Sequence, residues 1–304
     1  RVVHLMRRHL QEMGIDLNNL YQELEMESRF VDTHQDISWS NSNVSLHSHT
    51  FYEVLCCRNT CGAEYLVGSE RYRLQKGDII FISPGVSHRP LLPEHMTEPY
   101  IRDVLWMSIE FVQQIRKWVP TLNIGVEDNT TLLHTKEDVR SAIGKLFDHG
   151  IREAEREDED QDLALIGNTI TLLTQIKRAL EDATTHRMAA EKPELLDNIM
   201  AFVDAHYAED ISIDQLAKQF FVSCSTISHL FKQKMGVSFY RYVTQRRLIA
   251  AKSLIIEGLP LEAVGQRVGF SDYSSFYRAF KQEFGISPRQ FRKKQESVEH
   301  APIM

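Results

Sequence analysis

The sequence predicts a two-domain α+β protein, in which an N-terminal β-barrel with flanking helices precedes a C-terminal all-α domain. From about residue 40, short aromatic and β-branched runs broken by Gly, Pro and Asn are typical of a series of strands. Residues 194–295 instead repeat one helical pattern with a period of about fifty residues. The length of 304 residues is sufficient for about two domains that each bury a core.

The first 40 residues are expected to form a helical arm. Apolar residues recur at helical spacing in residues 2–13 and again in residues 17–26. We therefore assign residues 1–40 to an N-terminal arm that precedes the barrel.

Residues 41–125 are expected to form the barrel, and polar residues near its start indicate an interior site. His47, His49 and Glu53 are separated by even numbers of residues, so in a regular strand they point to one face. Residues 47–53 and 77–88 resemble the two motifs of a cupin barrel. This resemblance implies that His88 completes a set of three histidines and one carboxylate.

Two roles remain open for this set of four side chains. Imidazole and carboxylate groups suit a divalent transition metal such as zinc, nickel, iron or manganese. The same side chains can instead line an effector pocket and bind a small molecule directly, without metal. The residues concerned in both cases are His47, His49, Glu53 and His88.

Residues 126–184 predict two amphipathic helices. Apolar residues recur at helical spacing in residues 139–147 and in residues 163–176. These helices can form the interface of a homodimer, or they can cover an open side of the barrel. Residues 185–193 lack sustained apolar periodicity and are expected to link the two domains.

The second half of the C-terminal domain predicts a helix-turn-helix unit. Gly269 suits the tight turn between two helices, and Ser271 or Asp272 can cap the second of them. Phe276 and Phe280 fall on one side of that helix and are expected to pack. The opposite side is polar and is free to contact a partner.

The first half of the domain predicts a second unit of the same kind. Ser212 and Gln215 have the spacing of a capping box, and Ser223 can cap the following helix. Between the units, residues 239–257 contain neither Gly nor Pro and predict one stiff linker helix. Successive major grooves on one side of B-DNA lie about 34 Å apart, so two helices held at a fixed separation can enter both.

Residues 261–281 resemble the DNA-binding signature of the AraC/XylS family of bacterial transcription regulators. The resemblance implies a sequence-specific regulator that binds double-stranded promoter DNA as a homodimer and activates transcription through RNA polymerase. It also implies a small-molecule effector, for which a carbohydrate is the leading expectation.

Candidate DNA contacts lie on the polar faces of the two recognition helices and on the linker helix. Arg278 is expected to reach a guanine edge or a phosphate, whereas the lysines and the linker-helix cations are expected to contact the DNA backbone. The complete set is Ser225, Ser228, His229, Lys232, Arg246, Lys252, Tyr273, Ser274, Tyr277, Arg278 and Lys281.

The distribution of charge agrees with DNA binding by the C-terminal domain alone. The whole chain carries a formal net charge of -7. Residues 192–295 nevertheless contain 15 Lys and Arg against 10 Asp and Glu, whereas residues 1–191 contain 20 against 30. A basic domain joined to an acidic one is typical of a DNA reader with a separate sensing domain.

Other classes of protein are less well supported. A metal-dependent cupin enzyme fused to a DNA-binding module is the main alternative, but no further acid, base or nucleophile suggests catalysis. A DNA architectural protein without a ligand would leave the barrel unexplained. The sequence shows no signal-peptide pattern and no apolar run near the roughly 20 residues needed to span a bilayer, so we expect a cytoplasmic protein.

Overall fold

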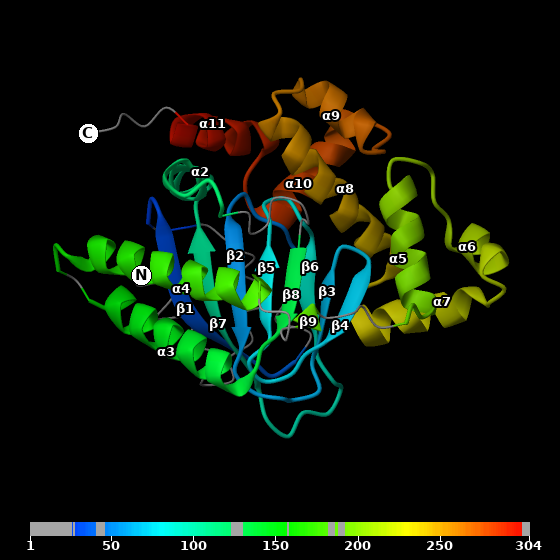
Figure 1. Cartoon of the computed structure of the whole chain (residues 1–304). Coiled ribbons are helices and arrows are strands. Elements are labelled where there is room, and N and C mark those ends of the chain that lie inside the picture. Colours follow the sequence, from blue (N-terminus) through cyan, green and yellow to red (C-terminus); the bar gives the residue numbers. More distant parts are fainter. Residues whose placement is uncertain are drawn as a thin grey trace. The chain divides into compact units, whose positions relative to one another are not determined.

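The computed structural model describes residues 26, 28–40, 46–122, 130–156, 158–181, 186–187 and 192–299. The described residues up to 187 form one compact unit, and residues 192–299 form another. The first unit is rich in strands and the second is helical (Figure 1). The predicted two-domain α+β organisation is therefore confirmed.

Two antiparallel sheets build the N-terminal unit. The larger sheet has the strand order β1-β7-β2-β5-β8-β9, and the smaller has the order β4-β3-β6. The strands are β1 (Val31–Ser38), β2 (Tyr52–Cys57), β3 (Glu64–Val67), β4 (Glu70–Arg73), β5 (Ile79–Ile82), β6 (His88–Leu91), β7 (Tyr100–Met107), β8 (Thr130–His134) and β9 (His186–Arg187).

The strand β2, inside the larger sheet, is buried on both faces. Val54 and Cys56 contribute to a core shared with the helices, while Leu55 and Cys57 contribute to a core shared with the smaller sheet. Successive side chains of a strand point to opposite faces. Glu53 has the same parity as Leu55, so its side chain enters the region between the two sheets.

Three helices complete the described part of this unit: α2 (Ile109–Trp118), α3 (Glu137–Ala154) and α4 (Gln161–Glu181). The helices α3 and α4 run side by side across the larger sheet (Figure 1). Buried residues of α2, α3 and α4 join the core on that face. The predicted helix pair therefore covers a sheet, while its role in dimerisation stays a prediction.

Several boundaries predicted for the N-terminal half are wrong. Residues 31–38, within the predicted helical arm, form β1 and pair with β7 along their full length. Residues 130–134 were assigned to the helical segment, but they form β8 and pair with β5. In both cases hydrogen bonds to a strand distant in the sequence outweigh weak local preferences.

The helix α2 also falls within residues 41–125, which were predicted as barrel, and β9 falls within the predicted linker. The predicted helices in residues 2–13 and 17–26 lie outside the described residues, apart from Met26.

The C-terminal unit consists of helices that follow the predicted pattern. They are α5 (Leu195–His206), α6 (Ile213–Gln219), α7 (Cys224–Leu230) with its π-helical continuation η2 (Phe231–Met235), α8 (Phe239–Ile256), α9 (Leu261–Arg267), α10 (Tyr273–Phe284) and α11 (Pro288–Glu299). The predicted pair of helix-turn-helix units and the linker helix α8 are confirmed.

Side-chain caps explain where these helices begin. The hydroxyl of Ser212 accepts a hydrogen bond from the backbone N–H of Gln215, and Ser223 accepts one from Thr226. The carboxylate of Asp272 accepts the corresponding bond from Ser275. Each cap satisfies a backbone donor that the first helical turn leaves without a partner.

No helix among the described residues combines the length and the apolar character needed to cross a membrane.

Candidate functional site

The two recognition helices present polar side chains at matching positions. Ser274, Arg278 and Lys281 are exposed on α10. Their counterparts Ser225, His229 and Lys232, which lie 49 positions earlier in the sequence, are exposed on α7 and η2. Ser228 is also exposed, and Tyr273 and Tyr277 are half-buried at the margin of the α10 face.

The opposite side of α10 fixes the helix in the domain. Phe276 and Phe280 are fully buried, and their rings lie 5.6 Å apart. Phe280 also contacts Phe284 and Phe291, with ring centroids at 4.6 and 5.8 Å. The packing side and the polar side predicted for this helix are both confirmed. A polar surface on a rigidly packed helix is suited to read the edges of base pairs.

Side-chain contacts connect α8 to both helix-turn-helix units. Arg241 forms an ion pair with the buried carboxylate of Glu283 on α10, and Gln245 donates a hydrogen bond to the same carboxylate at 3.1 Å. Arg247 donates hydrogen bonds of 2.7 Å to the backbone carbonyls of Tyr207 and Glu209, in the segment between α5 and α6. Towards the first unit, Phe239 and Tyr242 of α8 pack on Phe231, with ring centroids at 5.4 and 5.3 Å. The linker helix therefore contacts both helix-turn-helix units of the domain.

Glu283 and Arg247 were not among the residues singled out from the sequence. For Glu283 a signal was present, because it follows Phe280 by three positions and Phe276 by seven, which places it on the packing side of α10. A carboxylate on a packing side needs a buried partner. For Arg247 no such local signal exists, since its partners are backbone carbonyls about forty residues earlier.

The predicted DNA contact of Lys252 is wrong. The residue is only 6% exposed, and its ammonium lies over the rings of Phe284 and Phe291 at 4.9 and 5.3 Å. Because α8 packs against several helices, its lysine stem and ammonium are enclosed in the domain. Arg246 lies 2.5 Å from Asp204 in an ion pair, so its contact with DNA stays a prediction that requires this pair to be shared or opened.

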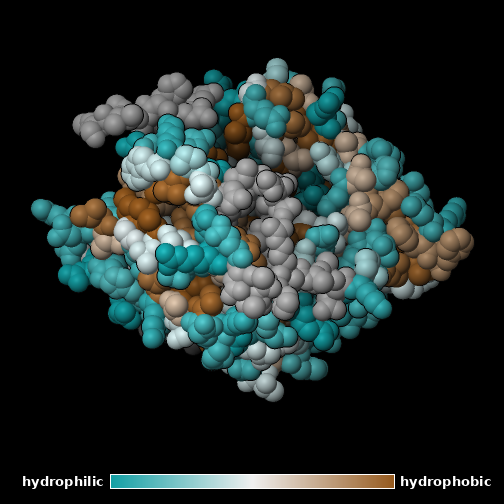
Figure 2. All heavy atoms as spheres, viewed as in Figure 1, coloured by the Kyte–Doolittle hydropathy of each residue, from teal (hydrophilic) through white to brown (hydrophobic). Residues whose placement is uncertain are grey.

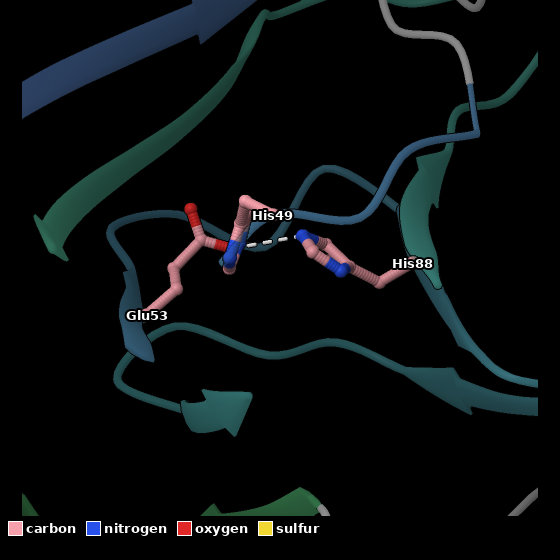
Figure 3. A group of neighbouring side chains, drawn as sticks. All are labelled: His49, Glu53 and His88. Atoms are coloured by element: carbon pink, nitrogen blue, oxygen red, sulfur yellow. Dashed lines mark hydrogen bonds and ion pairs between the residues drawn. The ribbon is translucent and has the colours of Figure 1, made fainter. Parts of the chain in front are cut away.

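In the N-terminal unit, the structure brings together three of the four predicted pocket residues. His49 precedes β2, Glu53 lies in β2, and His88 begins β6 (Figure 3). One ligand atom from each lies within 4.8 Å of the others, and all three residues are buried. The side chains therefore converge from both sheets on one point.

His47 lies beside this cluster but not in it. Its ring centroid is 4.3 Å from that of His88, and the backbones of the two residues form an isolated antiparallel bridge. The expectation of one regular strand from His47 to Glu53 is wrong, because β2 begins only at Tyr52. The His47 ring nevertheless lies beside those of His49 and His88, with ring centroids at 6.2 and 4.3 Å. Even spacing carries no information on side-chain direction where the backbone is irregular.

Burial and the neighbouring charges set the ionisation of the cluster. Burial opposes ionisation of Glu53, but hydrogen bonding and the charges of His49 and His88 hold the pKa of the Glu53 carboxyl well below its usual range. Burial lowers the pKa of the His49 imidazole, which favours the neutral ring. Glu53 is therefore a buried carboxylate with two buried imidazole partners.

Two helix-turn-helix units joined by one linker helix are typical of a DNA-binding protein. Residues 216–294 match a family model described as a helix-turn-helix domain. The chain is also 25% identical to the HTH-type transcriptional activator RhaS of Salmonella arizonae over 258 residues, which cover 83% of this chain and 88% of the relative. RhaS of Salmonella dublin is 24% identical over the same shares of the two chains.

Similar solved structures include the C-terminal domain of AraT, a response regulator from Geobacillus stearothermophilus. It is 28% identical, covers 34% of this chain and 86% of its own, and superposes with a TM-score of 0.33. ToxT from Vibrio cholerae with a bound unsaturated fatty acid is 12% identical, with coverage of 88% and 97% and a TM-score of 0.39.

The chain is similar to the AraC/XylS family of transcription regulators. Its signature residues, the helix-turn-helix match and the alignment with the RhaS activators agree on this point. These similarities support a DNA-binding transcription regulator.

Proposed function

We propose that this chain is a promoter-binding activator, acting with RNA polymerase, whose N-terminal domain responds to a small-molecule effector, with a carbohydrate as the leading candidate. DNA binding is supported by one observation: α7 with η2 and α10 expose polar side chains at matching positions, and α8 connects the two units. Support for a carbohydrate comes from the resemblance to regulators of carbohydrate use. The acidic, separately folded N-terminal unit is suited to sensing rather than to phosphate contact.

Arg278→Ala is expected to relax discrimination at one base pair of the operator. A guanidinium that bonds a base edge contributes about 1–3 kcal/mol of discrimination. The measurement is an in vitro selection of bound sequences, followed by titration of the selected DNA and of its single-base variants.

Lys281→Ala is the matched control, because Lys281 is exposed on the same helix and is expected to contact phosphate. Its loss should weaken binding to all sequences about equally and reduce the dependence on salt concentration. If Arg278→Ala behaves in the same way, the base contact assigned to Arg278 is wrong.

The effector is tested by titrating selected DNA in the presence of a panel of neutral and acidic monosaccharides. A responsive sugar should change DNA affinity and raise the melting temperature of the N-terminal unit, because a ligand that binds only the folded state stabilises it. A panel that changes neither quantity contradicts the carbohydrate proposal and leaves DNA binding untouched.

We also propose that the helices α2 and α4 contribute to a homodimer interface. Figure 2 shows apolar residues at the surface over these helices, and the exposed fractions of Leu163 and Trp118 are 73% and 64%. Exposed apolar patches are typical of interaction sites. Leu163→Glu is expected to shift the mass measured by light scattering from dimer to monomer, whereas Ile256→Glu, at an exposed position of α8, should not. A dimer that survives Leu163→Glu places the interface elsewhere.

A further inference from the structure

Glu283 places a buried carboxylate between the second recognition helix and the linker helix. It lies in the last turn of α10, and only 4% of the residue is exposed. Both of its oxygens are bonded to α8, which packs against α10 (Figure 1). Oε2 forms the ion pair with Arg241, and Oε1 accepts the hydrogen bond of 3.1 Å from the buried side chain of Gln245. Loss of either partner would leave a buried charge incompletely compensated, so these contacts favour one position of α10 on α8.

The two charges of this contact lie at the helix ends where they are least favourable. Glu283 is close to the C-terminus of α10, and Arg241 is in the first turn of α8. The helix dipole favours anions near the N-terminus and cations near the C-terminus. The stability of its own helix therefore explains neither charge, whereas the contact between the two helices explains both.

The internal repeat shows that a helix-turn-helix unit does not itself require this carboxylate. Lys234 is the counterpart of Glu283 in the first unit, 49 positions earlier in the sequence. Lys234 is exposed, whereas Glu283 is buried. The buried carboxylate therefore belongs to the connection between the units rather than to the structure that they share.

The same end of α8 is attached to the first unit. Phe239 and Tyr242 pack on Phe231, the first residue of η2. Only residues 236–238 separate η2 from α8. The first two turns of α8 therefore contact the continuation of the first recognition helix through aromatic rings and the second recognition helix through Glu283.

We propose that Glu283, held by Arg241 and Gln245, is a positioning residue that sets the orientation of the second recognition helix relative to the first. This inference rests on the proposed binding of two operator segments by the two recognition helices. Once one segment is bound, a fixed arrangement presents the second helix to its segment at a high effective concentration. A change in the orientation of α10 lowers this effective concentration without removing a side chain from the exposed polar face.

Titration of the full chain with three DNAs tests the proposal. The first is the complete operator selected by the wild type, and in each of the other two DNAs unrelated sequence replaces one of the two segments. Glu283→Gln keeps the size of the side chain and one oxygen acceptor but removes the charge. It should weaken binding to the complete operator by about tenfold and change binding to the single-segment DNAs by less than about twofold.

An operator with one inserted base pair gives a second readout, which depends on orientation. The insertion rotates one segment by about 34–36° relative to the other. It should cost the wild type about tenfold in affinity and cost Glu283→Gln clearly less. Arg241→Lys keeps a cation and should behave as the wild type, whereas Arg241→Gln should behave as Glu283→Gln.

Glu257→Gln is the matched control, because it makes the same change at an exposed residue that caps the opposite end of α8. It should alter neither the preference for the complete operator nor the cost of the insertion. If Glu283→Gln does not fold, as judged by circular dichroism, Arg241→Gln decides the test, since the Arg241 side chain is 38% exposed.

The proposal is overturned if the variants that remove the charge keep the full preference for the complete operator. It is equally overturned if they weaken binding to the single-segment DNAs as strongly as binding to the complete operator, because the residue then supports the fold of a unit and not its orientation. Failure of the wild type to select DNA with two segments contradicts the proposed function instead.

Discussion

Phe280→Ala is expected to unfold the second helix-turn-helix unit and to abolish specific DNA binding. The ring is fully buried and contacts three other aromatic rings of the same core. Truncation of such a side chain costs about 3–5 kcal/mol, because transfer free energy is lost and a cavity remains. This is a large fraction of the roughly 5–15 kcal/mol that stabilises a typical domain. Urea denaturation followed by circular dichroism measures the loss, and titration with DNA measures its consequence.

Phe221→Ala provides the matched control for this experiment. Phe221 is 94% exposed in the turn of the first unit, so its truncation removes almost no buried surface. The midpoint of urea denaturation should change little. Equal shifts for the two variants would contradict the assignment of Phe280 to the core.

Gly269→Ala is expected to have the next largest effect on stability. Gly269 has a φ of +94°, and a Cβ atom at this position would lie 2.7 Å from the backbone oxygen of Ala208. The unfavourable φ costs about 1–2 kcal/mol, and forcing a backbone apart adds about 1–3 kcal/mol. The turn of the second unit should therefore be displaced from the segment that follows α5. Urea denaturation and the affinity for selected DNA both report this displacement.

Gly285→Ala separates the two contributions. Gly285 ends α10 with a φ of +73°, but no atom lies within 4 Å of the position a Cβ would take. This variant should lose only the conformational part, about 1–2 kcal/mol. A loss as large as that of Gly269→Ala would mean that the contact with Ala208 is unimportant.

The helical half of the fold could be predicted from the sequence because its determinants are local. Caps such as Ser212 and Asp272 act within one helical turn, and the packing positions Phe276 and Phe280 repeat at the helical period. In the second helix-turn-helix unit, Gly269 indicates the position of the turn between the helices. The turn of the first unit has no glycine, because Phe221 adopts the positive φ of 55° there.

The sheet-forming half was less predictable because its contacts are long-range. β1 becomes a strand through pairing with β7, about seventy residues later in the chain. The convergence of His49 and Glu53 with His88 depends on segments about forty residues apart, which meet through the antiparallel bridge between His47 and His88. Burial of Lys252 likewise depends on α10 and α11, which follow α8 in the chain and pack against it.

The linker helix α8 also constrains which DNA the protein can bind. It spans 18 residues, or about 27 Å. Near its middle it is bonded to Glu283 of the second unit through Gln245 and to the segment between α5 and α6 through Arg247. One base pair inserted between two contacted segments rotates the second by about 34–36° around the duplex axis. Because α8 has no hinge, the two recognition helices cannot rotate relative to one another to match such an insertion. The two DNA segments of the operator therefore have to lie in a fixed helical phase, and any adjustment has to come from bending or twisting of the DNA.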